Sequence, residues 1–201
     1  MRIAGVDEAG RGPLAGPVVV SAVILDSARP IEGLNDSKKL TAAQREVLYD
    51  AVMRDALEVA IVEVDVARID TLNILHATMW GMRESVLRLR NAPSLALLDG
   101  NRIPGEMPVE ARALVKGDAI EQCIMAASII AKVTRDRLMC DMASKYPGYG
   151  FEVHKGYPTP SHLSCLRNLG VCEIHRRSFA PVKEAISGAV KTARMQAELI
   201  L

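Results

Sequence analysis

The chain has 201 residues, of which 49% are hydrophobic and 24% charged, a balance that excludes a disordered chain and predicts one globular domain over residues 1–201. The longest uncharged apolar run, Pro17–Leu25, is too short to span a membrane, and the net charge of +1 argues against wrapping nucleic acid by bulk attraction. The four cysteines form no Cys-x-x-Cys pair, which favours reduced thiols and a soluble, cytoplasmic protein over a zinc or redox motif.

Two adjacent carboxylates follow the first predicted strand. Asp7 and Glu8 come directly after the apolar residues Ile3–Val6, and a second strand is predicted at Val18–Leu25. Neighbouring carboxylates resist joint ionisation unless a cation lies between them, and Mg²⁺ or Mn²⁺ suits such oxygen ligands. A divalent metal site is therefore a candidate, and an ordinary surface Asp-Glu pair is the alternative.

A glycine-rich turn separates these strands. The residues Gly10–Gly16 allow a backbone to approach a phosphate closely, and Arg11 supplies one guanidinium to hold it. A dinucleotide-binding turn is excluded because the spacing is one residue too long, Pro13 interrupts it, and a strand follows instead of a helix. The alternative is a plain glycine turn in a hairpin.

The middle of the chain alternates helices and strands. Thr41 is a good N-cap for a helix to about Arg54, a third strand is predicted at Leu57–Val64, and helical periodicity marks Asn73–Arg90. A strand at Leu95–Leu98 ends at Asp99, and another at Ala113–Val115 precedes Asp118. Acids at neighbouring strand ends of a parallel arrangement meet at one edge of the sheet, although Asp99-Gly100-Asn101 is also ordinary turn chemistry.

The longest predicted helix runs from Ala119 to about Lys145 without Gly or Pro. Its small residues near Ser128 suit close packing on the sheet, and Asp136 on the same helix is positioned to reach the acids at the strand ends. An exposed Arg135-Asp136-Arg137 charge pattern is the alternative.

Basic and aromatic residues concentrate after this helix. Although only 3% of the chain is aromatic, four rings lie between Tyr146 and Tyr157, beside His154 and Lys155. Such a loop can stack on a sugar or base while it contacts phosphate; the alternatives are a small satellite core for the rings and a solvated helical face for the charges. Further helices are predicted at Ser161–Asn168, which Gly170 ends, and from Pro181 onward.

Seven motifs, in order and spacing, resemble bacterial ribonuclease HII over nearly the whole chain. They are Asp7–Gly12, Asn35–Lys38, Leu98–Gly100, Lys116–Asp118, Ala126–Lys132 with Arg135–Arg137, His154–Tyr157 and His175–Phe179. The resemblance implies an α/β ribonuclease H-like fold with a mixed five-stranded sheet flanked by helices at about residues 1–145 and a C-terminal helical part at about 146–201.

The resemblance also implies an activity. Such enzymes cut the RNA strand of RNA/DNA hybrids and incise 5′ of a single ribonucleotide embedded in duplex DNA, which leaves 3′-hydroxyl and 5′-phosphate ends. Two Mn²⁺ or Mg²⁺ ions are expected with substrate bound. The nucleic-acid duplex is the expected partner, the expected state is a monomer, and no replication or repair partner is identifiable from the sequence.

Site residues follow from the resemblance position by position. Asp7, Glu8, Asp99 and Asp136 match the catalytic, metal-binding carboxylates, and Asp118 matches a nearby acid whose direct metal role is left open. Gly10, Arg11, Gly12 and Tyr157 match the sensor of the RNA–DNA junction: the turn contacts the ribose 2′-hydroxyl through its backbone, and the tyrosine stacks at the adjacent deoxyribose. The further candidates for phosphate positioning are Lys38, Lys39, Lys155, Arg176 and Arg177.

Three other functions compete with this interpretation. The type 3 ribonuclease H carries an additional N-terminal domain and a different residue between the turn glycines, so Arg11 and the N-terminal strand argue against it. A resolvase-like nuclease would cut DNA that holds no ribonucleotide. A non-catalytic binding module for hybrids would have no use for four intact acids.

Overall fold

The computed structural model describes residues 2–188, which fall into two compact units. Of the described residues, the first unit comprises 2–11, 18–64 and 74–135, and the second comprises 12–17, 65–73 and 136–188. Two helices, α2 (Val66–Leu87) and α3 (Gln122–Lys145), each contribute residues to both units. No helix in the described part is long and apolar enough to cross a membrane.

The first unit is built on a mixed five-stranded sheet, as the sequence predicts. Its strand order is β3-β2-β1-β4-β5, in which β1 pairs antiparallel with β2 and parallel with β4, and β4 pairs parallel with β5. The strands are β1 (Ile3–Ala9), β2 (Val18–Ile24), β3 (Glu58–Val64), β4 (Leu95–Asp99) and β5 (Ala111–Leu114). Because β1 lies at the centre, its residues are covered from both sides.

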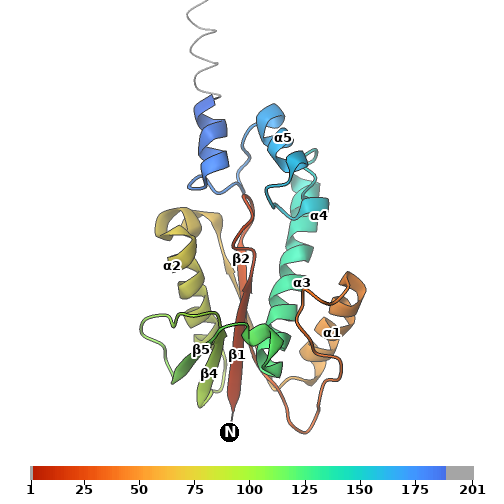
Figure 1. Ribbon diagram of the computed structural model, residues 1–201, viewed down its shortest axis with the longest axis vertical. Coiled ribbons are helices and arrows are strands. Elements are labelled where there is room, and N and C mark those ends of the chain that lie inside the picture. The colour runs from red at the N-terminus through yellow and green to blue at the C-terminus, as the bar shows by residue number, and fades with distance from the viewer. Residues whose placement is uncertain (1, 189–201) are drawn as a thin grey trace, which may run out of the picture. The chain divides into compact units, whose positions relative to one another are not determined.

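Helices cover both faces of this sheet (Figure 1). On one face, Val52 of α1 (Ala42–Asp55) and the small residues Ala126 and Ala127 of α3 pack with Val23 of β2. On the other face, Gly81 of α2 lies against β2 and β3, where an added Cβ would stand 2.7 Å from Val20 and 2.8 Å from Val64. The small residues of α2 and α3 thus let each helix approach the sheet closely.

The second unit is formed around the C-terminal helices. Tyr149 and Phe151 stack in a core with Met139 of α3, which confirms the satellite-core alternative for these two rings. The segment 12–17 joins this unit through backbone hydrogen bonds from Leu14 to Gly156 and from Gly16 to Ile174. Its helices are the start of α2, the end of α3, α4 (Phe151–His154), α5 (Pro160–Leu169) and the helical residues 180–188.

Local signals account for most helix ends, and three expectations need correction. Thr41 caps α1 with Gln44 in a reciprocal pair, as predicted. The helix expected from Asn73 is present, but a further helical stretch from Val66, which Asp65 caps through the N–H of Arg68, precedes it, and the non-helical Asn73 (φ 66°) marks the kink between the two within α2. Helix α3 starts at Gln122, after a 3₁₀ turn at Gly117–Ala119, and the short α4 occupies part of the predicted loop.

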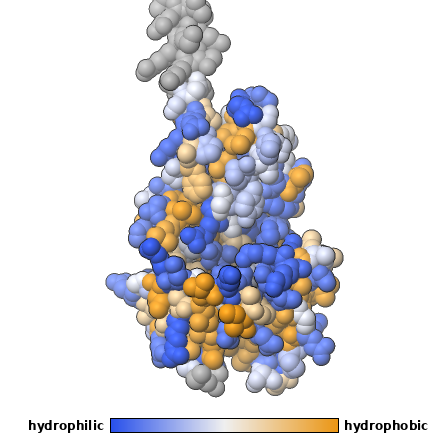
Figure 2. Space-filling model, viewed as in Figure 1, coloured by the Kyte–Doolittle hydropathy of each residue, from blue (hydrophilic) through white to orange (hydrophobic). Residues whose placement is uncertain are grey.

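The surface of the protein mixes both kinds of side chain. Figure 2 shows hydrophilic and hydrophobic residues interspersed over the visible face. Several of the basic residues between Lys132 and Arg177 do not face solvent at all, since Arg135, Arg176 and His175 are 1%, 0% and 0% exposed. The expectation that this stretch forms a solvated helical face is therefore wrong for these residues.

Candidate active site

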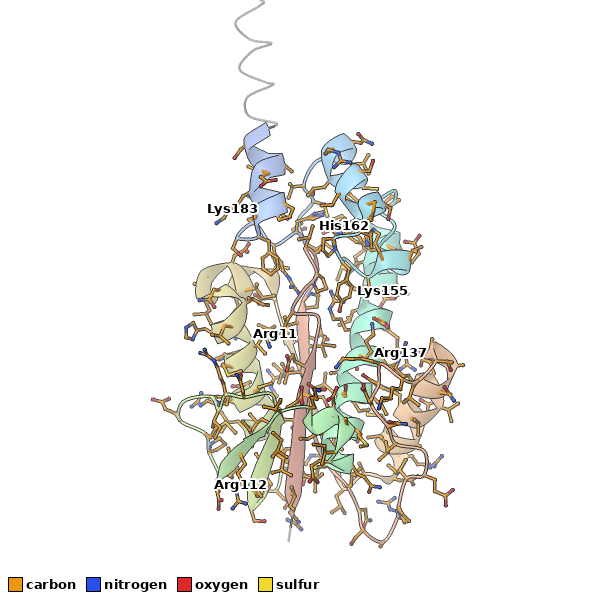
Figure 3. The ribbon with its side chains drawn as sticks, in the orientation of Figure 1. Arg11, Arg112, Arg137, Lys155, His162 and Lys183 are labelled. Atoms are coloured by element: carbon orange, nitrogen blue, oxygen red, sulfur yellow. The ribbon has the colours of Figure 1, made fainter. Side chains whose placement is uncertain are left out.

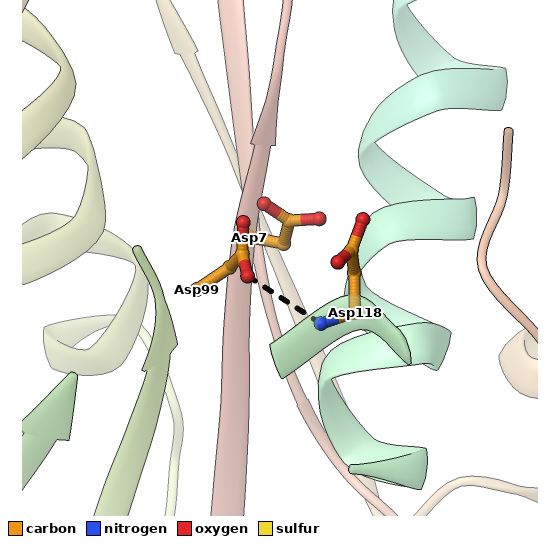
Figure 4. A group of neighbouring side chains, drawn as sticks. All are labelled: Asp7, Asp99 and Asp118. Atoms are coloured by element: carbon orange, nitrogen blue, oxygen red, sulfur yellow. Dashed lines mark hydrogen bonds between the residues drawn. The ribbon is translucent and has the colours of Figure 1, made fainter. Parts of the chain in front are cut away.

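Three carboxylates converge at one edge of the sheet in the first unit. Asp7 stands near the end of β1, Asp99 ends the parallel neighbour β4, and Asp118 follows β5 in the 3₁₀ turn. Each offers an oxygen within 4.8 Å of the oxygens of the other two (Figure 4). The parallel order of β1, β4 and β5 brings these acids together, as expected for the carboxyl ends of parallel strands.

Hydrogen bonds fix the orientation of this group. The N–H of Asp118 donates to Oδ1 of Asp99 at 3.4 Å, and the hydroxyl of Ser128 on α3 bonds to Asp7. Ser128 is held in turn by a 2.9 Å bond between its hydroxyl and that of Ser37. The group is thus part of a buried polar network that links β1, α3 and the 35–40 loop.

Glu8 follows Asp7 at the end of β1, and its charge contributes to the raised pKa of Asp7. It does not belong to the three-carboxylate group within the described residues. Its Oε1 accepts from Nη1 of Arg11 at 3.3 Å, whereas its buried Oε2 has no hydrogen-bond partner. A buried carboxylate oxygen that no donor satisfies is unfavourable and therefore suits a cation ligand.

The electrostatics of the site disfavour its ionised form. Burial, with the charges of Glu8 and Asp99, raises the pKa of Asp7 well above its usual range. Burial also raises the pKa of Glu8, against the opposing effect of Arg11, and burial with the charge of Asp118 raises the pKa of Asp99. A divalent cation would reverse this effect, so the donor set fits one.

One lysine already compensates part of this negative charge. Nζ of Lys38 donates to Oδ2 of Asp118 at 2.8 Å, and this hydrogen bond raises the pKa of Lys38. The Lys38 side chain is 78% exposed, so the ion pair contributes at most about 1 kcal/mol to stability. Lys38 thus lies beside the carboxylates at the protein surface, where a substrate phosphate has access to it.

The glycine turn is divided between the two units. Gly10 in the first unit adopts φ +95°, and an added Cβ there would lie 1.9 Å from Nε of the buried Arg135. Arg135 therefore fills the space that a side chain at Gly10 would need, a contact that the sequence does not reveal. Arg11 is exposed, and Figure 3 marks its position.

In the second unit, the other half of the turn meets the predicted tyrosine. Cε1 of Tyr157 stands 3.5 Å from the place of a Cβ on Gly12, and Tyr157 remains 42% exposed. The structure thus brings together two of the four predicted sensor residues within one unit. Asp136 also belongs to this unit and is partly buried on α3.

Comparison with known proteins decides the family. The family model described as Ribonuclease HII matches residues 4–182. The ribonuclease HII of Delftia acidovorans is 60% identical over 185 residues, which cover 92% of this chain and 78% of that protein. The chain belongs to the ribonuclease HII family.

Solved structures of relatives agree with this membership. Ribonuclease H2 from Pyrococcus horikoshii is 30% identical with a TM-score of 0.78, over 92% of this chain and 97% of that chain. Ribonuclease HII from Archaeoglobus fulgidus, solved in a complex with PCNA, is 26% identical with a TM-score of 0.76, over 90% of this chain and 96% of that chain. As a ribonuclease HII, the protein is an endoribonuclease that hydrolyses the RNA of RNA/DNA hybrids.

Basic candidates in this ribonuclease HII differ in accessibility. Lys38, Lys39 and Arg177 are exposed. Nζ of Lys155 lies 2.8 Å from Sγ of Cys140 and 2.7 Å from the carbonyl oxygen of Glu152. Arg176 is fully buried, and its Nε donates to the carbonyl of Gly16, so its guanidinium holds the 12–17 segment rather than facing a phosphate.

Stability of this ribonuclease HII is expected to fall in mild acid because of His175. Burial and the nearby His162 lower the pKa of His175 to about 4, below the ordinary value of about 6.5 that it has when unfolded. Between about pH 6.5 and pH 4, His175 is therefore protonated in the unfolded chain but neutral in the folded chain. The stabilising contribution is complete above about pH 6.5 and declines as the pH falls toward 4.

Chemical unfolding between pH 8 and pH 4 measures this effect. The free energy of unfolding of His175→Gln should fall less steeply over that window than that of the wild type. The exposed His76 offers a matched control, and His76→Gln should follow the wild-type curve. Parallel curves for all three proteins would show that His175 does not contribute.

Proposed function

We propose that this protein incises duplex DNA on the 5′ side of a single embedded ribonucleotide, in a reaction that depends on divalent metal and leaves 3′-hydroxyl and 5′-phosphate ends. Its roles would be ribonucleotide removal from DNA and removal of RNA primers, in the cytoplasm. The observation that carries the proposal is the group formed by Asp7, Asp99 and Asp118 at the sheet edge. Hard divalent cations bind such oxygen sets.

Asp7, Glu8 and Asp99 are the proposed ligands in the first unit. Asp7 and Asp99 share the three-carboxylate group, and the unpartnered Oε2 of Glu8 supplies a further oxygen. Asp136 is proposed as the fourth catalytic carboxylate on its match to the family motif. Asp118 offers an oxygen within 4.8 Å of an oxygen of Asp7 and of an oxygen of Asp99. It is therefore proposed as a metal ligand or as a direct neighbour of one.

When bound, Mg²⁺ or Mn²⁺ would supply an activated water and charge stabilisation at the scissile phosphate. The protein's own groups hold the carboxylates in place: Ser128 orients Asp7, and the N–H of Asp118 orients Asp99. Nη1 of Arg11 donates to one oxygen of Glu8, and its positive charge lowers the net negative charge of the carboxylates at the site. The mechanism requires no covalent enzyme intermediate.

Recognition of the ribonucleotide is proposed for Gly10, Arg11, Gly12 and Tyr157. Only RNA carries a 2′-hydroxyl, so a backbone contact to that group separates a ribonucleotide from its DNA neighbours without reading base sequence. The position of the Tyr157 ring, 3.5 Å from the place of a Cβ on Gly12, supports this assignment, because it puts an exposed aromatic side chain beside the turn. The exposed Lys38, Lys39 and Arg177 are proposed to position phosphates, and the protein is proposed to act as a monomer.

The test uses a labelled DNA duplex that contains one ribonucleotide, with an all-DNA duplex and an RNA/DNA hybrid beside it. With Mg²⁺ or Mn²⁺ we expect one incision, on the 5′ side of the ribonucleotide, mapped at single-nucleotide resolution. Chelation with EDTA should abolish cleavage, and the all-DNA duplex should stay intact.

Each other pattern has a distinct meaning. Cleavage of the all-DNA duplex would indicate a resolvase-like nuclease, and cleavage of the hybrid alone would contradict recognition of single ribonucleotides. Full activity in EDTA, after the protein has been stripped of metal, would contradict the metal-dependent mechanism.

A further inference from the structure

Three histidines lie buried together in the second unit, next to the Tyr157 segment. His154 is 9% exposed, and His162 and His175 are 0% exposed; Figure 3 marks His162 at the start of α5. The rings of His154 and His162 stack with their centroids 4.4 Å apart. None of the three has a role in the proposed chemistry, so their arrangement calls for an explanation of its own.

The hydrogen bonds of His162 and His175 run in one direction. A carbonyl oxygen only accepts, so the 3.0 Å contact of His162 Nδ1 with the carbonyl of Tyr157 places the proton on Nδ1. Nε2 of a neutral His162 then carries a lone pair, and His175 Nε2–H donates to it at 3.1 Å. Because Nε2 carries the proton of a neutral His175, its Nδ1 is an acceptor for the backbone N–H of Cys172 at 3.0 Å, which is shorter than the 3.3 Å contact of the same nitrogen with the carbonyl oxygen of Cys172.

This chain of hydrogen bonds exists only while both histidines are neutral. A proton added to Nε2 of His162 would set two N–H groups against each other across the 3.1 Å contact, and a proton added to Nδ1 of His175 would oppose the backbone N–H of Cys172. Burial lowers the pKa of His162, and burial with the charge of His162 lowers that of His175, in agreement with neutral rings. The groups facing the chain from the adjacent elements are His154, Tyr149, Phe151 and Cys172.

The third histidine holds the residue before Tyr157. His154 Nε2–H donates to the carbonyl of Tyr149 at 2.7 Å, so its Nδ1 accepts from the N–H of Gly156 at 3.1 Å. Gly156 adopts φ +83°, and an added Cβ would lie 2.6 Å from the carbonyl oxygen of Ala15. No other residue type fits this backbone without a shift.

Every backbone polar group of Gly156 and Tyr157 is consequently bonded. The carbonyl of Gly156 accepts from Leu14, the N–H of Tyr157 donates to His154, and the carbonyl of Tyr157 accepts from Thr159 and from His162. Hydrogen bonds at all four groups hold the backbone of this dipeptide in one conformation, although Tyr157 is 42% exposed. Preorganisation of this kind lowers the ordering cost of binding.

We propose that His154, His162 and His175 are positioning residues which fix the Tyr157 ring against Gly12, and that through Tyr157 they set how well the enzyme recognises a single ribonucleotide. The inference rests on the proposed function of Tyr157 in the junction sensor. The histidines touch neither substrate nor metal in this scheme. They act only through the backbone of residues 156–157.

The test compares two replacements of His162. In His162→Asn, the side-chain amide retains a donor near the place of Nδ1, whereas His162→Leu removes it. We expect His162→Leu to lower kcat/KM on the single-ribonucleotide duplex about tenfold, mainly through KM, and His162→Asn to stay within about threefold of the wild type. Rates are compared at a temperature where circular dichroism shows each variant folded.

A double-mutant cycle separates positioning from general destabilisation. When Tyr157→Ala is already present, His162→Leu should cost less than about twofold, because the ring that it positions is gone. Asp70→Ala is the matched control: it removes the carboxylate that caps Arg177 and Ser178, and it touches neither His162 nor Tyr157. Its effect should be the same with and without Tyr157→Ala.

Nitrogen-15 spectra of the histidine rings test the chain without substrate. They should show a proton on Nδ1 of His162 and on Nε2 of His175, both rings neutral at pH 7. The opposite tautomer of either ring would overturn the proposal, and so would equal losses from His162→Leu with and without Tyr157. A wild type that cuts hybrids but not single ribonucleotides would contradict the proposed function instead. The nitrogen-15 spectra would then still show whether the hydrogen bonds between His162 and His175 run in the proposed direction.

Discussion

Replacing Asp7 by Asn is expected to lower the rate of RNA-strand cleavage at least about a thousandfold, which corresponds to roughly 4 kcal/mol of activation free energy. Asp7 is the member of the carboxylate group on the central strand, and its oxygens face both Asp99 and Ser128. Asn keeps the size and one acceptor of the side chain but lacks the negative charge that would hold a cation. Single-turnover cleavage of a labelled hybrid and of a single-ribonucleotide duplex, at saturating enzyme, measures the loss.

The same substitution is expected to stabilise the metal-free protein near neutral pH. Burial and like charges raise the pKa of Asp7, so the folded state binds a proton more tightly than the unfolded state does. The stabilising contribution of protonated Asp7 is complete at low pH, and it is lost as the pH rises through the raised pKa of Asp7. Asn at position 7 carries no charge, so the variant avoids that loss. A gain of about 1 kcal/mol in the free energy of unfolding would raise the Tm by about 2–4 °C.

Asp50→Asn is the matched control, since Asp50 is an exposed carboxylate on α1 in the same unit. It should cleave and unfold like the wild type. Cleavage by Asp7→Asn within tenfold of the wild-type rate would refute the assignment of Asp7. A Tm below that of the wild type in EDTA would refute the electrostatic account.

Gly5→Ala is expected to destabilise the protein by about 3 kcal/mol or more. An added Cβ on Gly5 would stand 2.1 Å from the carbonyl carbon of Cys123 and 2.4 Å from the backbone nitrogen of Ile124. These are backbone atoms near the start of α3, so no side-chain rotation relieves the overlap. The helix must move away from β1, and Ser128 on that helix moves away from Asp7.

Urea unfolding measures this destabilisation, with Gly105→Ala as the control because nothing lies within 4 Å of a Cβ at Gly105. The control should remain within about 0.5 kcal/mol of the wild type. Equal unfolding midpoints for the two variants would contradict the close packing of α3 on β1. An insoluble Gly5→Ala beside a soluble Gly105→Ala agrees with the prediction.

Local chemistry explains why much of the fold is predictable from the sequence. The capping pair at Thr41, the apolar runs that end at Asp7 and Asp99, and the stop at Gly170 are each encoded within a few residues. The start of α2 also had a local signal, Asp65, but the polar residues before Asn73 obscured the periodicity. A kink with φ 66° at a non-glycine residue has no such signal in the sequence.

Contacts between distant segments account for what the sequence did not predict. Asp118 was expected near the other carboxylates, whereas the close approach of Arg135 to Gly10 depends on how α3 packs and has no signal in the sequence. His162 and His175 lie among the basic residues between Lys132 and Arg177, yet both are buried, and burial lowers the pKa of each. Their partners are each other and backbone groups of Tyr157 and Cys172. A sequence does not reveal such partners, because every residue type has the same backbone carbonyl group.

The central position of β1 has a consequence for synthesis on the ribosome. Ile3 pairs in parallel with Leu95, and β5 must then join β4 before the sheet is complete. The strand β1 therefore waits for 92 further positions of the sequence, from Ile3 to Leu95, before its parallel partner appears. Such long-range pairing slows folding and leaves the apolar edges of the sheet uncovered until β4 and β5 have been synthesised.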